Sequence, residues 1–145
     1  MALTLRSSGM CEGGDMAAGS TQRVYAEAFL AALAKRDYGA IASSLHPNVA
    51  FRALLPSRVA EHGGSEAAVD EIRGWFEEAT DFAMLGSSVD EVVDRTRIWF
   101  RIRLRDDDGW AVVEQTAFCD ADGDGITSLN LVCSGWREID SPYAT

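Results

Sequence analysis

The sequence predicts one α+β domain in which helices pack on a curved antiparallel sheet. Apolar residues recur every three or four positions in the first half of the chain and then at every second position, so helices precede a run of strands. Stretches rich in Asp and Gly separate the later segments, as expected of hairpin turns. The length of 145 residues suits one core. We expect a flexible arm over residues 1–18, the domain over 19–140 and a tail over 141–145.

The composition limits the classes of partner. A net charge of −10 would repel a phosphate backbone, so nucleic acid is not an expected partner. No apolar run approaches the roughly 18 residues of a membrane span, so no membrane is expected either. Ser7–Gly14 is polar where a signal peptide would have its apolar core. We therefore expect a cytoplasmic protein whose cysteines, Cys11, Cys119 and Cys133, are reduced thiols.

Three helices are predicted before residue 80. Residues 20–36 form the first, capped by Ser20 or Thr21, and Tyr38–Leu45 form the second, capped by Asp37. The third begins at Ser65, which can serve as its N-cap. Its buried stripe consists of Ala68, Ile72, Trp75, Phe76 and Ala79.

Strands are predicted on both sides of the third helix. Alternation over Val49–Leu55 indicates a strand, and Arg58–His62 is a short partner for it. Beyond residue 80 the expected meander has four strands, with a break or bulge at Gly86-Ser87-Ser88 in the first. These strands cover Phe82–Val93, Arg97–Arg105, Trp110–Asp120 and Ile126–Trp136.

Three local features accompany this order of elements: Phe29–Leu33 leading to Asp37, Leu45–Phe51 entering a strand, and Gly125–Leu129 after a turn. With them, the order of elements resembles the nuclear transport factor 2-like superfamily, and within it the small bacterial SnoaL-like proteins. The resemblance implies a cone-shaped sheet around the helices, with a ligand or active site inside. It also implies a homodimer through the outer sheet face.

The resemblance does not carry over a known catalytic set. In the ketosteroid isomerases of this superfamily, the tyrosine that polarises the substrate would fall at Phe29, the general base at Ala53 and the neutral aspartic acid at Thr116. None of these residues can perform that role. Arg101 and Arg103 have no acids at the spacing of an epoxide-hydrolase-like Asp-Arg-Asp set.

Hairpin geometry predicts which residues face the helices. A turn centred on Gly123 and Asp124 places Glu114 opposite Cys133 and Thr116 opposite Leu131. Because the last strand has one apolar face, formed by Leu129, Leu131 and Cys133, the residues expected inside with it are Trp110, Val112, Glu114, Thr116 and Phe118.

Glu114 is the one charged group among these residues. A carboxylate in apolar surroundings needs a cation, a donor or a raised pKa. It is either part of an internal hydrogen bond or ion pair, or a general base or ligand anchor, unless the register places it at the surface. Its candidate partners are Arg52, His62 and Tyr25, of which Arg52 is equally well placed for the opposite face of its strand.

Two further groups contain residue types that occur in metal or catalytic sites. Asp120–Gly125 repeats the first six positions of a calcium-binding EF-hand loop, but the twelfth position is Leu131 and the flanks are strands, so an acidic hairpin turn is expected. His46 precedes Pro47 in a turn and is expected to be a cap or surface residue. With two distant histidines, neither a metal nor a cofactor is expected.

Two functions in particular fit these patterns. One is a SnoaL-like domain that binds a small hydrophobic molecule in a largely apolar pocket. The other is a cofactor-independent isomerase, cyclase or hydrolase acting on a hydrophobic polycyclic or terpenoid-like compound, with Glu114 as base and Tyr25 or His62 as donor. An assembly module is a third reading. The expected pocket residues are Phe29, Phe51, Arg52, Trp75, Phe76, Phe100, Thr116, Phe118 and Cys133.

The outer face of the sheet is the expected contact between subunits. Arg97, Arg101 and Arg103 alternate with buried residues, and Trp99 lies among them with Val113 and Val132 expected alongside. An exposed aromatic residue surrounded by arginines suits a protein contact.

Overall fold

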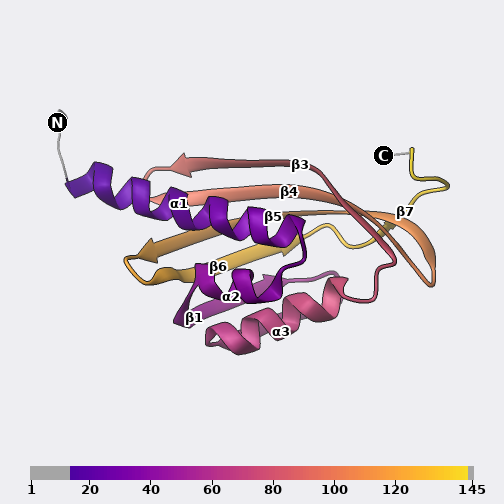
Figure 1. Ribbon diagram of the computed structural model, residues 1–145, viewed down its shortest axis with the longest axis horizontal. Helices are drawn as coiled ribbons and strands as arrows, with labels where there is room; N and C mark the ends of the chain where they lie inside the picture. The colour runs from indigo at the N-terminus through magenta and orange to yellow at the C-terminus, as the bar shows by residue number, and fades with distance from the viewer. Residues whose placement is uncertain (1–13, 144–145) are drawn as a thin grey trace.

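The structure, a computed structural model, describes the backbone of residues 14–143 and the side chains of residues 21–143 (Figure 1). Most of the expected arm therefore lies outside the described residues. Three helices precede or interrupt a sheet of seven strands. In chain order the elements are α1 (Gly14–Ala34), α2 (Tyr38–Ser44), β1 (Leu45–Leu54), β2 (Val59–Gly63), α3 (Ser65–Phe76), β3 (Asp81–Val92), β4 (Arg95–Asp106), β5 (Gly109–Asp122), β6 (Gly125–Cys133) and β7 (Arg137–Glu138).

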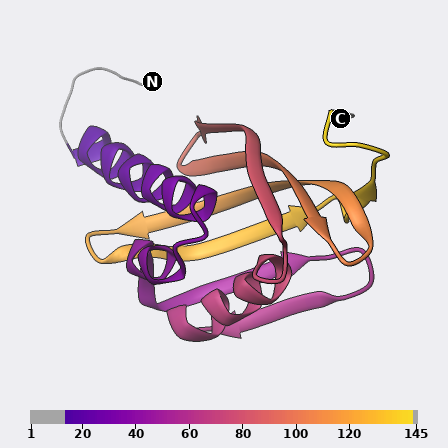
Figure 2. The same cartoon turned by 45° about the vertical axis from the view of Figure 1, so that its right-hand side comes forward.

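The strands form one curved sheet in the order β2-β1-β6-β5-β4-β3, with β7 paired to β5. The expected four-strand meander, β3 to β6, is confirmed. The sheet is mixed and not wholly antiparallel, because β1 pairs with β6 in parallel. β6 is the strand that lies between β1 and β5 in the sheet, although β1 and β6 are far apart in the chain. The sheet curls around the helices, as Figure 2 shows.

The helices cover the concave side of the sheet, and the core lies between the two layers. Phe29 and Leu33 of α1 and Ile72 and Phe76 of α3 are buried against alternate residues of the strands. Within the described residues, no helix combines the length and apolar character needed to cross a membrane.

The predicted N-cap residue is observed in one helix, α2, and is not observed in the other two. The Asp37 carboxylate caps α2 by accepting the Ala40 backbone N–H at 3.0 Å, as predicted. α1 begins at Gly14, so Ser20 lies within the helix and does not cap it. In α3, Ser65 is the first helical residue and Gly64, at φ 100°, is the N-cap without a side-chain hydrogen bond.

A bulge in β6 reverses the predicted facing of β5. Next to the turn Ala121 pairs with Ile126, but one residue further Asp120 pairs with Ser128, which leaves Thr127 as an extra residue. Beyond it Gln115, and not Glu114, lies opposite Cys133. Because facing alternates along a strand, one extra residue exchanges the two faces.

Two groups of residues are therefore corrected. The inner face of β5 consists of Ala111, Val113, Gln115, Ala117 and Cys119, all of them buried. The residues predicted to lie inside, Trp110, Val112, Glu114, Thr116 and Phe118, alternate with them and face outward, whereas Val113 was expected on the outer face. Leu129, Leu131 and Cys133 of β6 face inward as predicted.

Gly125 holds the β5–β6 turn against the start of β1. It has φ 132°, and a Cβ there would lie 2.6 Å from His46 N and 2.7 Å from the Leu45 carbonyl carbon. Both neighbours are backbone atoms, which cannot rotate away. Only glycine fits both the conformation and the close approach.

We predict that Gly125→Ala lowers the free energy of unfolding by about 2–3 kcal/mol, since it adds backbone strain and a clash. Urea denaturation measures the change. Gly123→Ala, in the same turn but with nothing within 4 Å of its added Cβ, is the control and should change stability by about 1 kcal/mol or less. Equal losses in the two variants would contradict this account.

Candidate functional site

Most of the predicted aromatic pocket residues lie on the inner side of the cone, where they are buried or partly buried, whereas Phe118 lies on the outer face of the sheet. Phe29, Phe51, Phe76 and Phe100 are each at most 2% exposed. Phe76 contacts the rings of Trp75, Phe82 and Trp136, at centroid distances of 6.0, 5.5 and 5.9 Å. These rings belong to the packed core. Space for a ligand therefore lies at the edge of the cluster.

Glu114 lies on the outer face of the sheet. Its Oε1 accepts two hydrogen bonds from the cross-strand residue Arg101, at 3.0 and 2.8 Å. Hydrogen bonds from Trp99 and Arg101 hold its pKa below the ordinary value. The carboxylate is thus ionised and paired in a half-exposed position, and the apolar environment that motivated its role as a base is absent. Thr116 and Phe118 lie on the same outer face.

Gln115 takes the inner position instead. It is 1% exposed, and neither its Nε2 nor its Oε1 has a hydrogen-bond partner in the described part of the protein. The other buried polar side chains there, Ser44 and Thr96, are both paired, with the Ile41 carbonyl and the Gln22 amide oxygen. A buried, unpaired amide costs about 1–3 kcal/mol, so Gln115 is the one polar group of the inner face with unused bonding capacity.

The other predicted partners of Glu114 do not meet it. Tyr25 donates its hydroxyl to the Gly123 carbonyl at 2.8 Å, at the β5–β6 turn. Arg52 lies on the outer face of β1 and pairs with Glu61 at 3.4 Å, with both side chains more than half exposed. The predicted set is therefore spread over separate parts of the molecule.

His62 belongs to a network centred on Glu71, a residue of α3 that sequence reasoning missed. The Glu71 side chain is 11% exposed. It accepts the Trp75 indole N–H at 2.8 Å and an Arg58 guanidinium N–H at 2.6 Å, and His62 Nε2 lies 2.9 Å from its Oε1. The signal for this network in the sequence was the i,i+4 spacing of Glu71 and Trp75, which places the two side chains next to each other on a helix.

This network fixes Trp75 at the open end of the cone. Burial alone would raise the pKa of Glu71, but the hydrogen bonds from Arg58, His62 and Trp75 outweigh it and lower the pKa below the ordinary value. Glu71 is therefore ionised near neutral pH and keeps the Trp75 N–H engaged. The hydrogen bond to Glu71 orients the indole, and Trp75 also lines a neighbouring space.

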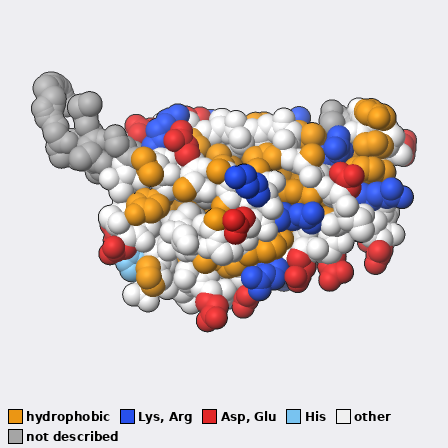
Figure 3. All heavy atoms as spheres, in the orientation of Figure 1, with side chains coloured by type: hydrophobic (Ala, Val, Ile, Leu, Met, Phe, Trp, Pro, Cys, Tyr) orange, Lys and Arg blue, Asp and Glu red, His pale blue; other side chains and the backbone are white. Residues whose placement is uncertain are grey.

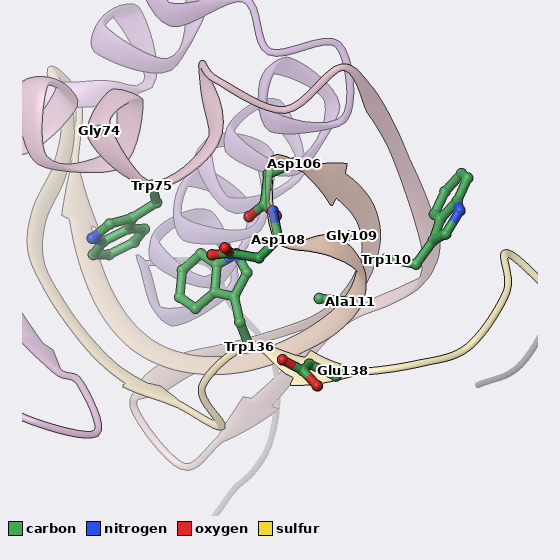
Figure 4. Close-up of a pocket in the computed structure, with 9 residues that line it drawn as sticks. All are labelled: Gly74, Trp75, Asp106, Asp108, Gly109, Trp110, Ala111, Trp136 and Glu138. Atoms are coloured by element: carbon green, nitrogen blue, oxygen red, sulfur yellow. The ribbon is translucent and has the colours of Figure 1, made fainter.

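That space is a hollow of about 430 Å³, here called the mouth hollow. Figure 4 shows Trp75 and Trp136 beside it, with the carboxylates of Asp106 and Asp108 directed toward the space between them. The Trp110 ring points away. The full lining is Gly74, Trp75, Asp106, Asp108, Gly109, Trp110, Ala111, Trp136 and Glu138.

The mouth hollow adjoins the inner face that carries Gln115. Ala111 lines the hollow, and Ala111, Val113 and Gln115 follow one another along the inward face of β5. Trp136, which rests on Phe76, lies where the chain leaves β6 and turns toward β7. Of the predicted site residues only Trp75 lines this hollow. The remaining lining residues come from α3, from the β4–β5 turn and the strand ends beside it, and from the segment after β6 that leads into β7. The sequence pattern does not reveal the path of that last segment.

A second hollow of about 430 Å³ lies along β1, β2 and β6. Its lining includes Phe51, Arg52 and His62, but the Phe51 side chain is buried and that of His62 points to Glu71. Strand alternation places Arg52 and Asn130 on the outer face. This hollow is therefore part of the outer sheet surface, apart from the cone interior.

In the structure, His46 lies beside the acidic β5–β6 turn. Ligand atoms of His46, Asp122 and Asp124 all lie within 4.8 Å of one another in the described chain. However, His46 Nδ1 accepts the Asn48 backbone N–H at 2.9 Å, so in the neutral ring Nε2 carries the proton. A metal-bound histidine needs a free lone pair on the nitrogen that faces the metal, and usually donates from the other. The arrangement favours a hydrogen-bonded turn, and β5 and β6 flank it as strands.

Comparisons with known proteins give a likeness of fold. No family model and no curated protein matches the sequence. Among solved structures, AusH from Aspergillus nidulans superposes with a TM-score of 0.64 at 14% identity, over 79% of this chain and 84% of that one. An NTF2-like protein of unknown function from Burkholderia pseudomallei gives 0.61 at 14%, over 77% and 88%. TerC, co-crystallised with polyporic acid, gives 0.60 at 14%, over 77% and 89%.

These likenesses, together with the three helices and the curved, unclosed sheet, show that the chain has the nuclear transport factor 2-like fold. The resemblance noted from the order of elements is confirmed at the level of fold. At these identities the fold alone is shared, so the activity must be argued from this chain's own residues.

We predict that Glu71→Gln makes the protein less stable by about 1–3 kcal/mol at neutral pH, because the lost charge weakens three hydrogen bonds. The lowered pKa sets the sign of the pH effect: the contribution is complete above the ordinary glutamate pKa of about 4.3 and is lost as the pH falls through the lower folded-state pKa. The difference between wild type and variant should therefore shrink in acid.

Urea unfolding over a pH series measures this difference. Glu78→Gln, at an exposed position in the segment after α3, is the control and should show little difference from wild type at any of these pH values. A difference for Glu71→Gln that stays constant from neutral pH into acid would show that its charge is not what holds the network.

Proposed function

We propose that the protein binds a small, planar aromatic molecule in the mouth hollow. The observation that carries this proposal is a space of about 430 Å³ at the open end of the cone, bordered by two tryptophans. Ligand pockets of small molecules are commonly about 300–1,000 Å³ and combine aromatic walls with a few polar groups. Trp75 is held by Glu71 and Trp136 rests on Phe76, so both rings are positioned before a ligand arrives.

Binding is better supported than proton-transfer catalysis. The buried polar side chains of the described residues are Ser44, Thr96 and Gln115, none of which titrates near neutral pH. Burial raises the pKa of the Cys119 thiol to about 12, so this group stays protonated. Glu114, the base of the enzymatic alternative, faces away from the mouth hollow and is neutralised by Arg101. The buried inner face therefore carries no carboxylate or imidazole among the residues described, and its unpaired polar side chain is the neutral amide of Gln115.

The shared fold gives this proposal a precedent. TerC, which has 14% identity to this chain, was co-crystallised with polyporic acid. A protein of this fold has therefore been crystallised together with a small organic molecule. The identity of the molecule does not transfer at this level of similarity.

The probe N-phenyl-1-naphthylamine, a neutral aromatic compound whose fluorescence rises when it leaves water, tests the proposal. We expect a saturable rise with the wild type and affinity about tenfold weaker with Trp136→Leu, since an aromatic contact contributes about 0.5–1.5 kcal/mol. Trp99→Leu, on the outer face, is the control and should bind as the wild type does. No saturable rise with the wild type, or equal binding by Trp136→Leu, would exclude the mouth hollow as the site.

We also propose that two copies of the chain associate through the outer sheet face. Val132 and Leu54 are 53% and 51% exposed there, and Trp99 and Phe118 are only partly covered. In the described chain, the helices pack on the opposite side of the sheet (Figure 1). Exposed apolar residues on a broad face, ringed by arginine–carboxylate pairs, suit a contact between subunits.

For this dimer we predict that Val132→Glu shifts the protein toward monomer, because it places a charge in the apolar centre of the contact. Sedimentation velocity at micromolar concentration measures the change. Val93→Glu, at a 98% exposed position in the β3–β4 turn, should leave the association unchanged. A wild-type protein that is already monomeric at this concentration would contradict the proposed dimer.

A cytoplasmic location remains part of the proposal. Cys119 and Cys133 are free, and the register pairs them with Leu129 and Gln115, so they do not lie opposite each other. Reduced, buried thiols suit a reducing compartment.

A further inference from the structure

We infer that the mouth hollow selects an organic cation, a compound with an aromatic ring and a positively charged nitrogen. The inference rests on the proposed function and adds the charge of the ligand to it. Three of the nine residues that line the hollow are acids, Asp106, Asp108 and Glu138, and none is Lys, Arg or His. Acidic side chains also gather where α3 ends and the β4–β5 turn lies, at the lower right of Figure 3.

The carboxylates at the mouth have no basic partner, unlike most acids of the strands. Asp81, Asp90, Asp120, Glu61 and Glu114 each lie within ion-pair distance of an arginine. Within residues 21–143, Asp106, Asp108 and Glu138 form no ion pair. The Asp106 carboxylate instead accepts the Asp108 backbone N–H at 2.9 Å, which shapes the turn and leaves its charge uncompensated.

Arg103 and Arg105 of β4 do not line the hollow. The guanidinium groups of Arg103 and Arg105 lie over the ring of Trp110, at 5.5 and 5.6 Å from its centroid. That ring points away from the mouth hollow (Figure 4). Trp110 thus engages two positive charges away from the hollow, and the charged residues that line it are all acids.

The aromatic walls favour the same sign of charge. The face of an indole ring carries negative electrostatic potential and attracts a cation within about 6 Å. The Trp75 N–H, the positive edge of its ring, is already engaged by Glu71 at 2.8 Å. A cation between Trp75 and Trp136 would meet ring faces and carboxylates together, whereas a carboxylate ligand would be repelled by all of them.

Isothermal titration calorimetry with three probes of similar shape tests the inference at low ionic strength and mildly alkaline pH. The probes are N-methylquinolinium chloride, neutral quinoline and the anion quinaldate. We expect N-methylquinolinium to bind about tenfold more tightly than quinoline, given cation–π and exposed carboxylate contributions of about 0.5–2 and 0.2–1 kcal/mol. Quinaldate should bind more weakly than either.

The double variant Asp108→Asn/Glu138→Gln assigns the selectivity to the mouth. Both residues are exposed, so the fold should tolerate the change. We expect N-methylquinolinium to lose most of its advantage while the affinity for quinoline is unchanged. Asp107→Asn is the matched control, because Asp107 is a neighbouring exposed acid that does not line the hollow.

The outcomes separate this inference from the proposed function. If quinoline binds as tightly as N-methylquinolinium and Trp136→Leu weakens both, the hollow is a ligand site and its preference for cations is wrong. If the double variant still binds N-methylquinolinium more tightly than quinoline by the same factor as the wild type, the carboxylates do not cause the preference for a cation. In that case the inference is also wrong. If no probe binds the wild type with a saturable heat, the mouth hollow is not an aromatic site, and both proposals fail.

Discussion

The pairing of β5 with β6 shifts by one residue at Thr127, and the facing of every residue further along β5 depends on that shift. Gly125 anchors the turn beside the bulge, since its missing Cβ lets the chain approach the backbone of Leu45 and His46. From this point the sheet presents Gln115 to the helices and Glu114 to the outside. The register set by the bulge therefore determines which residues of β5 face the cone interior.

The consequence is a division of charge between the two faces of the sheet. Among the described residues, the inner face of the sheet is apolar apart from a few uncharged polar groups, and the one that is unpaired is the neutral amide of Gln115. The outer face holds the arginine–carboxylate pairs, among them Arg101 with Glu114 and Arg97 with Asp90. Because charges are costly to bury without a partner, this division lets the cone pack densely. It also leaves recognition of a ligand to the open end, where acids and aromatic rings meet water.

The open end is organised from α3. Glu71 is nearly buried, yet it is kept ionised by Arg58, His62 and Trp75, and so it links β2 to the end of the helix. Trp75 is the member of this network that also lines the mouth hollow. Trp136 approaches from the opposite side and is supported by Phe76. Core packing and the mouth of the cone thus share the same aromatic residues.

The sequence by itself determined the fold class, the order of the elements and most of the core, because hydrophobic period and turn residues are local signals. The buried positions of Phe29, Phe51, Phe76 and Phe100 follow from that periodicity. The parallel pairing of β1 with β6, the bulge at Thr127 and the position of Trp136 were decided only in the tertiary structure. Each depends on contacts between segments far apart in the chain. A slip of one residue changes the face of a whole strand without changing its alternating pattern, and for this reason the sequence indicated Glu114 where the folded protein has Gln115.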